Sequence, residues 1–149
     1  MNIAIMGIGM VGGPLAKFFT SEGRDAGQYD PPKGLNDASV LERADVIFVA
    51  VPTPYYLDGN GFDLSFLHEA IRAIPGSGKV VVLKSTILPG TTASMQKTYP
   101  QHRFLHNPEF LTEQRAEWDT FHPERQIIGY TDQSLSLIHI SEPTRLRRI

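Results

Sequence analysis

A glycine-rich segment directly after the first apolar run constrains this chain more than any other feature. Residues 2–6 read as a buried strand, and Gly7, Gly9 and Gly12 follow it in the spacing G-x-G-x-x-G. Between a strand and a helix, this pattern is typical of dinucleotide-binding turns. The first glycine permits a tight turn, the second lets the backbone approach a pyrophosphate, and the third allows close helix packing. The alternative is a strand-to-helix turn that merely needs glycine.

An acidic residue after the second predicted strand supports the dinucleotide interpretation. The spacing of apolar residues predicts a helix over residues 11–22, and a short strand over residues 24–29 then leads to Asp30. A carboxylate at this place can accept hydrogen bonds from the adenosine ribose hydroxyls and would repel a 2′-phosphate, which favours NAD over NADP. The alternative is that Asp30 is only a turn residue before two prolines.

The rest of the chain continues an alternation of strands and helices. We predict a single Rossmann-like α/β domain with a doubly wound, mostly parallel sheet of about six strands, because its strands read as continuous apolar runs. The segment between residues 31 and 43 has almost no room for a third strand, so the region after the second strand is shortened. The other predicted elements are strands over residues 44–51, 79–83, 103–106 and 125–130, helices over residues 37–43, 63–74 and 91–99, and a turn over residues 58–61.

Polar residues follow several of these strands. Thr53 lies between two prolines after one strand, and Thr86 lies in a polar segment after the next. Open α/β sheets bind ligands at the carboxyl ends of their strands, where both residues are expected. Farther on, Glu109 and Glu113 are four residues apart, a spacing that would stack two carboxylates on one helix face. That arrangement is mildly destabilising unless a cation, a substrate hydroxyl or water uses it; a solvated helix face is the alternative.

Composition excludes several classes of function. The 14 basic and 16 acidic residues give a net charge of −2, which argues against a broad grip on nucleic acid or an anionic membrane. The chain has no cysteine and therefore no disulfide, thiolate nucleophile or cysteine-based zinc site. The five histidines show no metal-ligand spacing, so no metal is predicted. Because there is no basic leader and no run of 18 apolar residues, we expect a soluble cytoplasmic protein.

Taken together, the motifs resemble the N-terminal NAD-binding domain of the UDP-glucose/GDP-mannose 6-dehydrogenase family. Members of this family oxidise the C6 alcohol of a sugar nucleotide to a carboxylate with two molecules of NAD. The resemblance therefore implies NAD as cofactor, a sugar-nucleotide substrate and, for the intact protein, a homo-oligomer. Besides Asp30, the matching segments are GIGMVG, ADVIFVAVPTP, DGNGFDLSFL, KSTILPGTT and NPEFLTEQRAEWDTFHPERQIIG.

The resemblance also implies roles for single residues. Glu113 falls at the family's substrate-contacting glutamate, while Glu109 and Thr86 fall at positions that order a catalytic water or relay a proton. These residue types suit the chemistry, because alcohol oxidation needs a base for the hydroxyl proton and thioester hydrolysis needs a base to activate water. The implied cofactor-binding residues are Gly7, Gly9, Met10, Val11, Gly12, Asp30, Lys33, Thr53 and Thr86.

The chain also departs from the family pattern. Thr112 and Gln114 stand where family members often carry arginine and glycine, and the cysteine that forms a covalent thiohemiacetal in a later family domain is absent. We therefore expect this chain to bind NAD at most. Two alternatives remain: a β-hydroxyacid dehydrogenase of the 6-phosphogluconate or 3-hydroxyisobutyrate type, and a non-catalytic NAD(H)-binding regulatory module.

The last residues have an unusual sequence. LSLIHISEPTR, from Leu135 to Arg145, matches residue by residue the translation of a common transposon-end sequencing adapter. We therefore predict that residues 1–134 form the NAD-binding domain of a truncated protein and that residues 135–149 are a non-native read-through tail. Natural coding is the alternative.

Overall fold

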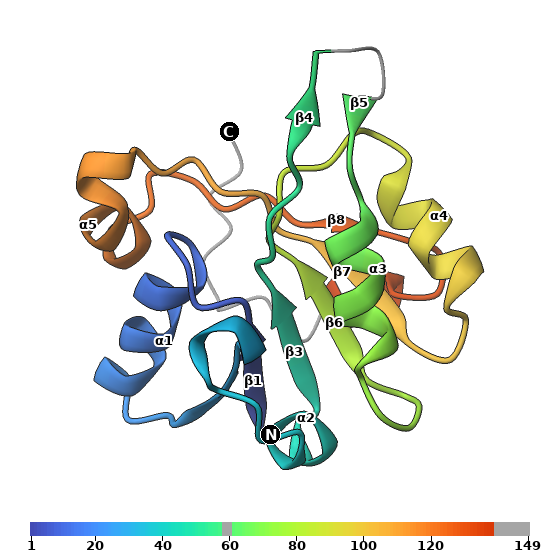
Figure 1. Ribbon diagram of the computed structural model, residues 1–149, viewed down its shortest axis with the longest axis horizontal. Helices are drawn as coiled ribbons and strands as arrows, with labels where there is room; N and C mark the ends of the chain where they lie inside the picture. Colours follow the sequence, from blue (N-terminus) through green and yellow to red (C-terminus); the bar gives the residue numbers. More distant parts are fainter. Residues whose placement is uncertain (58–60, 139–149) are drawn as a thin grey trace.

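The centre of the protein is a six-stranded sheet, seen in a computed structural model that describes residues 1–57 and 61–138 (Figure 1). The strand order is β2-β1-β3-β6-β7-β8. The first five strands are parallel, and the last runs antiparallel to its neighbour. This arrangement confirms the predicted Rossmann-like fold. The bounds are β1 Ile3–Met6, β2 Ala26–Tyr29, β3 Val46–Val49, β6 Val80–Leu83, β7 Arg103–His106 and β8 Gly129–Tyr130.

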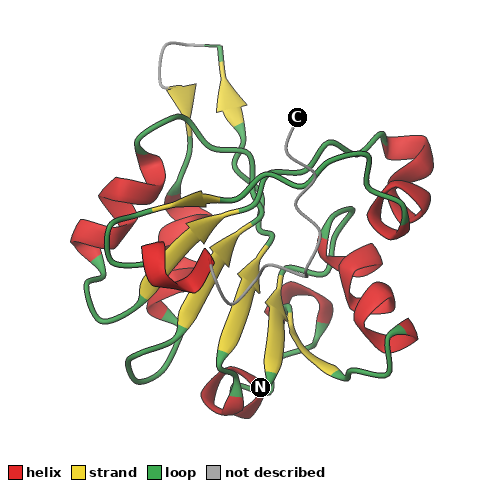
Figure 2. Cartoon of the chain, turned by 180° about the vertical axis from the view of Figure 1, so that it is seen from behind, coloured by secondary structure: helices red, strands yellow, loops and turns green. Residues whose placement is uncertain are grey.

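Helices cover both faces of this sheet (Figures 1 and 2). Helices α2, α3 and α4 contribute to the core on one face, whereas α1 and α6 pack on the other. Helix α5 lies against α1, where Phe18 and Phe121 make an edge-to-face ring contact at 5.6 Å. The helix bounds are α1 Gly12–Ser21, α2 Ser39–Arg43, α3 Ser65–Arg72, α4 Thr91–Thr98, α5 Ala116–Phe121 and α6 Leu135–Ile138.

Burial on both faces explains why the sequence of β1 is apolar throughout. Ile3 and Ile5 pack toward Ala16 of α1, whereas Ala4 and Met6 belong to the core under α2, α3 and α4. All four β1 residues are buried. A strand covered on both faces has no solvent-facing position, so the alternation of polar and apolar residues is lost.

The position of β1 also locates the binding edge of the sheet. The chain goes from β1 outward to β2 and then returns to β3 on the other side of β1. Only the short 3-10 helix Pro31–Lys33 and α2 lie between β2 and β3, so no strand beyond β2 is present among the described residues, as the shortened region predicts. The reversal places a topological switch point at the carboxyl ends of β1 and β3, where open α/β sheets bind ligands.

Three segments differ from the predicted elements. Residues 107–112 form an irregular loop and Glu113–Arg115 a 3-10 turn, so the expected shared helix face for two glutamates is wrong. Strand β8 is two residues long and begins at Gly129, which pairs with His106 at the end of β7. The antiparallel hairpin of β4 Tyr55–Tyr56 and β5 Gly61–Phe62 was not predicted. Most of the turn predicted over residues 58–61 lies outside the described residues.

The predicted tail begins at a short helix. Leu137 of α6 is buried in a cluster with Val82 and Leu105. Residues 139–149 lie outside the described part of the chain, and the boundary at residue 135 stays a prediction. Within the described residues, none of the helices combines the length and the apolar character needed to cross a bilayer.

Candidate active site at the carboxyl edge of the sheet

The glycine turn after β1 leaves room at one of its three glycines. Gly7 has a φ of 84°, and a Cβ added there would lie 2.6 Å from the Ala50 carbonyl oxygen. A Cβ added at Gly12 would lie 1.9 Å from the Gly7 carbonyl oxygen. The protein's own packing therefore requires these two glycines. At Gly9 an added Cβ would meet no described atom within 4 Å, so the space beside it is open to a ligand.

The start of α1 presents unused hydrogen-bond donors beside this space. The backbone N–H groups of Met10 and Val11 have no acceptor among the described residues. The N-terminal end of a helix also carries partial positive charge from its aligned peptide dipoles. Free N–H groups together with this charge favour an anionic group such as a pyrophosphate. The residues present thus fit the phosphates of a dinucleotide.

Asp30 and Lys33 hold the glycine turn from the end of β2. Asp30 Oδ2 accepts a hydrogen bond of 2.7 Å from the Ile8 backbone N–H, and the Lys33 ammonium donates to the Ile8 carbonyl oxygen. The peptide group of Ile8 is therefore bound on both sides. Oδ1 of Asp30 accepts no hydrogen bond from the described residues, which leaves it available to a ribose hydroxyl.

Thr53 and Thr86 are brought together although they follow different strands. The Thr53 hydroxyl donates to the Thr86 carbonyl oxygen at 2.6 Å. Ser85 makes a similar link, since its hydroxyl donates to the Val51 carbonyl oxygen at 2.6 Å. These bonds join the loops after β3 and β6 at the switch-point edge. The Thr86 hydroxyl itself has no partner in the part of the chain that the structure describes.

A buried lysine, which sequence reasoning missed, contacts Glu109. Lys84 follows β6, its side chain is 4% exposed, and its ammonium forms an ion pair with the Glu109 carboxylate. The same ammonium donates to Asn107 Oδ1 at 2.7 Å. Burial lowers the pKa of Lys84 to about 8. The available signal was a lysine placed directly after a buried strand, before the polar segment that holds Thr86.

Lys84, Asn107 and Glu109 line a cavity of about 520 Å³, which reaches from the carboxyl edge to α1 and α5. Its wall includes the exposed ring of Trp118, which stacks on His122 at 3.9 Å. The cavity therefore combines a charged pair with an apolar wall, a combination common in binding sites for small molecules.

Glu113 is separated from this cavity. It is exposed, and it is absent from the lining residues. The loop before it is held by Asp119, whose Oδ2 accepts hydrogen bonds from the Thr112 N–H at 3.1 Å and the Thr112 hydroxyl at 3.0 Å. The structure thus brings Glu109 to the cavity wall and leaves Glu113 outside, and the family role of Glu113 stays a prediction.

Comparison with known proteins agrees with this geometry. Residues 34–142 match the sequence profile described as the UDP-glucose/GDP-mannose dehydrogenase family, NAD binding domain. The match extends over well more than half of the chain. The chain belongs to this family. The family domain binds NAD, which confirms the predicted cofactor and fold.

Similar proteins include both curated relatives and solved structures. A UDP-glucose 6-dehydrogenase of Streptococcus pneumoniae is 33% identical over 64% of this chain and 25% of the relative. The UDP-glucose 6-dehydrogenase YwqF of Bacillus subtilis is 38% identical over 62% of this chain and 23% of the relative. A UDP-glucose dehydrogenase structure from Pyrobaculum islandicum superposes with a TM-score of 0.76 at 26% identity, covering 93% of this chain and 43% of that one.

The matches cover only part of the relatives, and the family match covers only part of the candidate site. The chain spans about a quarter of the length of the two curated relatives. Thr53, Thr86 and Glu109 lie within the family match, whereas Asp30 and the glycine turn precede it. The assignment of Asp30 therefore rests on its place beside the glycine turn.

Proposed function

We propose that this chain is the NAD-binding part of a sugar-nucleotide 6-dehydrogenase, which oxidises the C6 alcohol of a UDP- or GDP-sugar to a carboxylate. One observation carries the proposal: the carboxyl edge of a single sheet holds both an open glycine turn and a cavity with a paired glutamate. The first suits a dinucleotide and the second suits an alcohol that must lose a proton. Membership of the family supports the same conclusion.

The proposed cofactor site uses the groups left free at the switch point. The N–H groups of Met10 and Val11 bind the pyrophosphate beside Gly9, and Oδ1 of Asp30 accepts a ribose hydroxyl. Lys33 holds the turn in the shape that allows both contacts. Thr53 and Thr86 line the cofactor farther along the edge. When bound, NAD supplies the hydride acceptor for the oxidation.

The proposed catalytic groups lie on the loops after β6 and β7. Glu109 takes the proton of the C6 hydroxyl or orients water through the oxygen that Lys84 leaves free, and Thr86 assists with its hydroxyl. Glu113 contacts the substrate from the neighbouring turn. Because the chain contains no cysteine, it cannot form the thiohemiacetal of the second oxidation, and we expect NAD binding without turnover from this chain alone.

We extend the proposal to the protein's partners and location. A sugar nucleotide is the substrate class that agrees with the relatives' names, and we expect the intact enzyme to be a homo-oligomer. A cytoplasmic location suits a chain without cysteine.

Calorimetric titration with NAD and NADP tests the cofactor proposal. In Asp30→Ala we expect NAD to bind at least about tenfold more weakly, since a hydrogen bond to a charged group contributes about 1.5–3 kcal/mol. The discrimination against NADP should also decrease, because the charge that repels a 2′-phosphate is removed.

The matched control is Asp25→Ala, which removes an exposed carboxylate just before β2, at the amino end of the sheet. It should bind NAD as the wild type does. Equal NAD affinity in Asp30→Ala and the wild type would refute the ribose role.

A further inference from the structure

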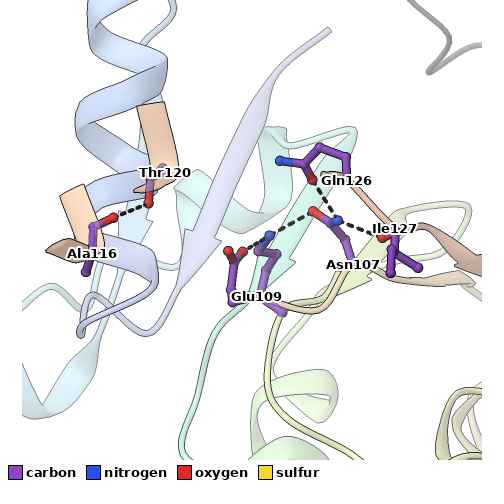
Figure 3. A network of polar contacts seen from close by, with 7 residues as sticks. Asn107, Glu109, Ala116, Thr120, Gln126 and Ile127 are labelled. Carbon is purple, nitrogen blue, oxygen red and sulfur yellow. Dashed lines mark hydrogen bonds and ion pairs between the residues drawn. The ribbon is translucent and has the colours of Figure 1, made fainter. Parts of the chain in front are cut away.

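Asn107 fixes the direction of the Lys84 side chain. Its Nδ2 donates to Gln126 Oε1 at 3.0 Å and to the Ile127 carbonyl oxygen at 2.8 Å (Figure 3). Its Oδ1 accepts from the Lys84 ammonium at 2.7 Å. A flipped amide would turn its NH₂ group toward an ammonium and its oxygen toward two acceptors. Only one orientation of Asn107 therefore satisfies all three bonds.

The ion pair of Lys84 is asymmetric in its exposure. The Lys84 side chain is 4% exposed, whereas that of Glu109 is 21% exposed and lies on the cavity wall. A buried ammonium is costly, and an apolar side chain of similar length would fill the same position without that cost. A contribution to stability therefore does not explain why the pair is present. The carboxylate of Glu109, its more exposed member, lies on the cavity wall, where a ligand can reach it.

We propose that Lys84, oriented by Asn107, is a positioning residue that keeps the Glu109 carboxylate charged and fixed at the wall of the cavity. The ammonium occupies Oε1 of Glu109 and leaves Oε2 for a hydroxyl group or a water molecule. Lys84 acts only through Glu109 and does not itself contact the substrate. The inference rests on the proposed function, in which Glu109 is the base.

Other charged groups surround this pair. His106, at the end of β7, has its pKa lowered by burial and further by the charge of Lys84. Arg115, Glu124 and Arg125 line the same cavity. Among the described residues, the Glu109 carboxylate is the anionic group in direct contact with the Lys84 ammonium.

The test is an NMR titration of the Lys84 side-chain nitrogen in the complete chain, with its signal identified by its loss in Lys84→Arg. In Glu109→Gln we expect Lys84 to titrate at least about one pH unit lower than in the wild type, because a buried ammonium loses its anionic partner. Asn107→Ala should give a smaller shift in the same direction. Glu109→Asp, which keeps a shorter carboxylate, should lie between Glu109→Gln and the wild type.

Glu124→Gln is the matched control, since Glu124 lines the same cavity without a contact to Lys84 among the described residues. It should leave the Lys84 titration unchanged. If Lys84 titrates in Glu109→Gln as it does in the wild type, its ammonium does not act on the Glu109 carboxylate, and the inference is overturned. Titration of the wild type with NAD separates the two proposals: failure to bind NAD contradicts the proposed function and leaves the Lys84 result standing.

Discussion

The hydroxyl of Thr53 donates to the carbonyl oxygen of Thr86 across 2.6 Å. This bond spans the loops after β3 and β6, two neighbouring strands whose carboxyl ends form part of the proposed cofactor site. The residues are 33 positions apart in the chain, and the parallel pairing of the two strands brings them together. The bond thus couples the order of one loop to the order of the other.

Replacement of Thr53 by valine tests this coupling. Thr53→Val keeps the side-chain shape but removes the donor, so we expect the free energy of unfolding to fall by about 1 kcal/mol. NAD affinity should fall severalfold because the loops lose their link, and Thr53→Ser should retain both properties. Urea unfolding and calorimetry measure the two effects.

The control for Thr53→Val is Thr98→Val. The Thr98 hydroxyl donates to the Ser94 carbonyl oxygen within the exposed part of α4, away from the switch point. This variant should lose a comparable or smaller amount of stability and keep full NAD affinity. If Thr53→Val binds NAD as tightly as Thr98→Val does, the cofactor role of Thr53 is wrong.

Two glycine substitutions separate folding from ligand binding. In Gly12→Ala the new Cβ would lie 1.9 Å from a backbone oxygen, so we expect a loss of about 3 kcal/mol or more, or failure to fold. In Gly9→Ala the new Cβ meets open space, so the thermal midpoint by circular dichroism should stay close to that of the wild type. NAD binding to Gly9→Ala should nevertheless be at least about tenfold weaker, because the methyl group occupies the space proposed for the pyrophosphate. Wild-type NAD affinity in Gly9→Ala would disprove that use of the space.

Burial of Lys84 predicts how stability depends on pH. Its pKa falls from the ordinary value of 10.5 to about 8. Between these two values the unfolded chain binds more protons than the folded chain, so stability rises with pH in this window. The cost of burying the charge is fully present below about pH 8 and has an upper limit of about 3 kcal/mol.

Urea unfolding of the wild type and Lys84→Met between pH 7.5 and about 10.5 measures this contribution. The stability of the wild type should rise relative to that of the variant as the pH increases. Lys97→Met removes an exposed lysine, so its free energy of unfolding should change with pH as that of the wild type does. A difference in the free energy of unfolding between the wild type and Lys84→Met that does not change with pH would contradict the lowered pKa of Lys84.

The sheet could be predicted because its strands carry the signal locally. The segment Arg103–His106 was predicted with the observed bounds, and Leu67 and Ile71, within the helix predicted over residues 63–74, are buried. Asp37 and Asp63 accept hydrogen bonds from the N–H groups of Ser39 and Ser65, where α2 and α3 begin. These features depend on spacing and on short-range hydrogen bonds, which a sequence displays directly.

The loops beyond the strands could not be predicted in the same way. Glu109 and Glu113 have helical spacing, but Asp119 takes the N–H group of Thr112 and the segment forms no helix. Strand β8 was predicted too long: Gly129 already pairs with His106, the last residue of β7, and the Ile127 carbonyl oxygen accepts a hydrogen bond from the Asn107 side chain. In both segments a side chain bonds to a backbone group of another part of the chain, and the spacing of apolar residues does not show such a bond.

The sequence by itself determined the six strands of the main sheet, helices α1 to α4, the glycine turn and the residues of the family pattern, because each depends on neighbouring positions. Only the tertiary structure decided that Lys84 meets Glu109 and that Glu113 does not line the same cavity. The parallel register pairs Leu83 with His106, so Lys84 and Asn107 emerge side by side at the next position. A contact set by register between strands has no local signal in the chain, and it became visible once the sheet was in place.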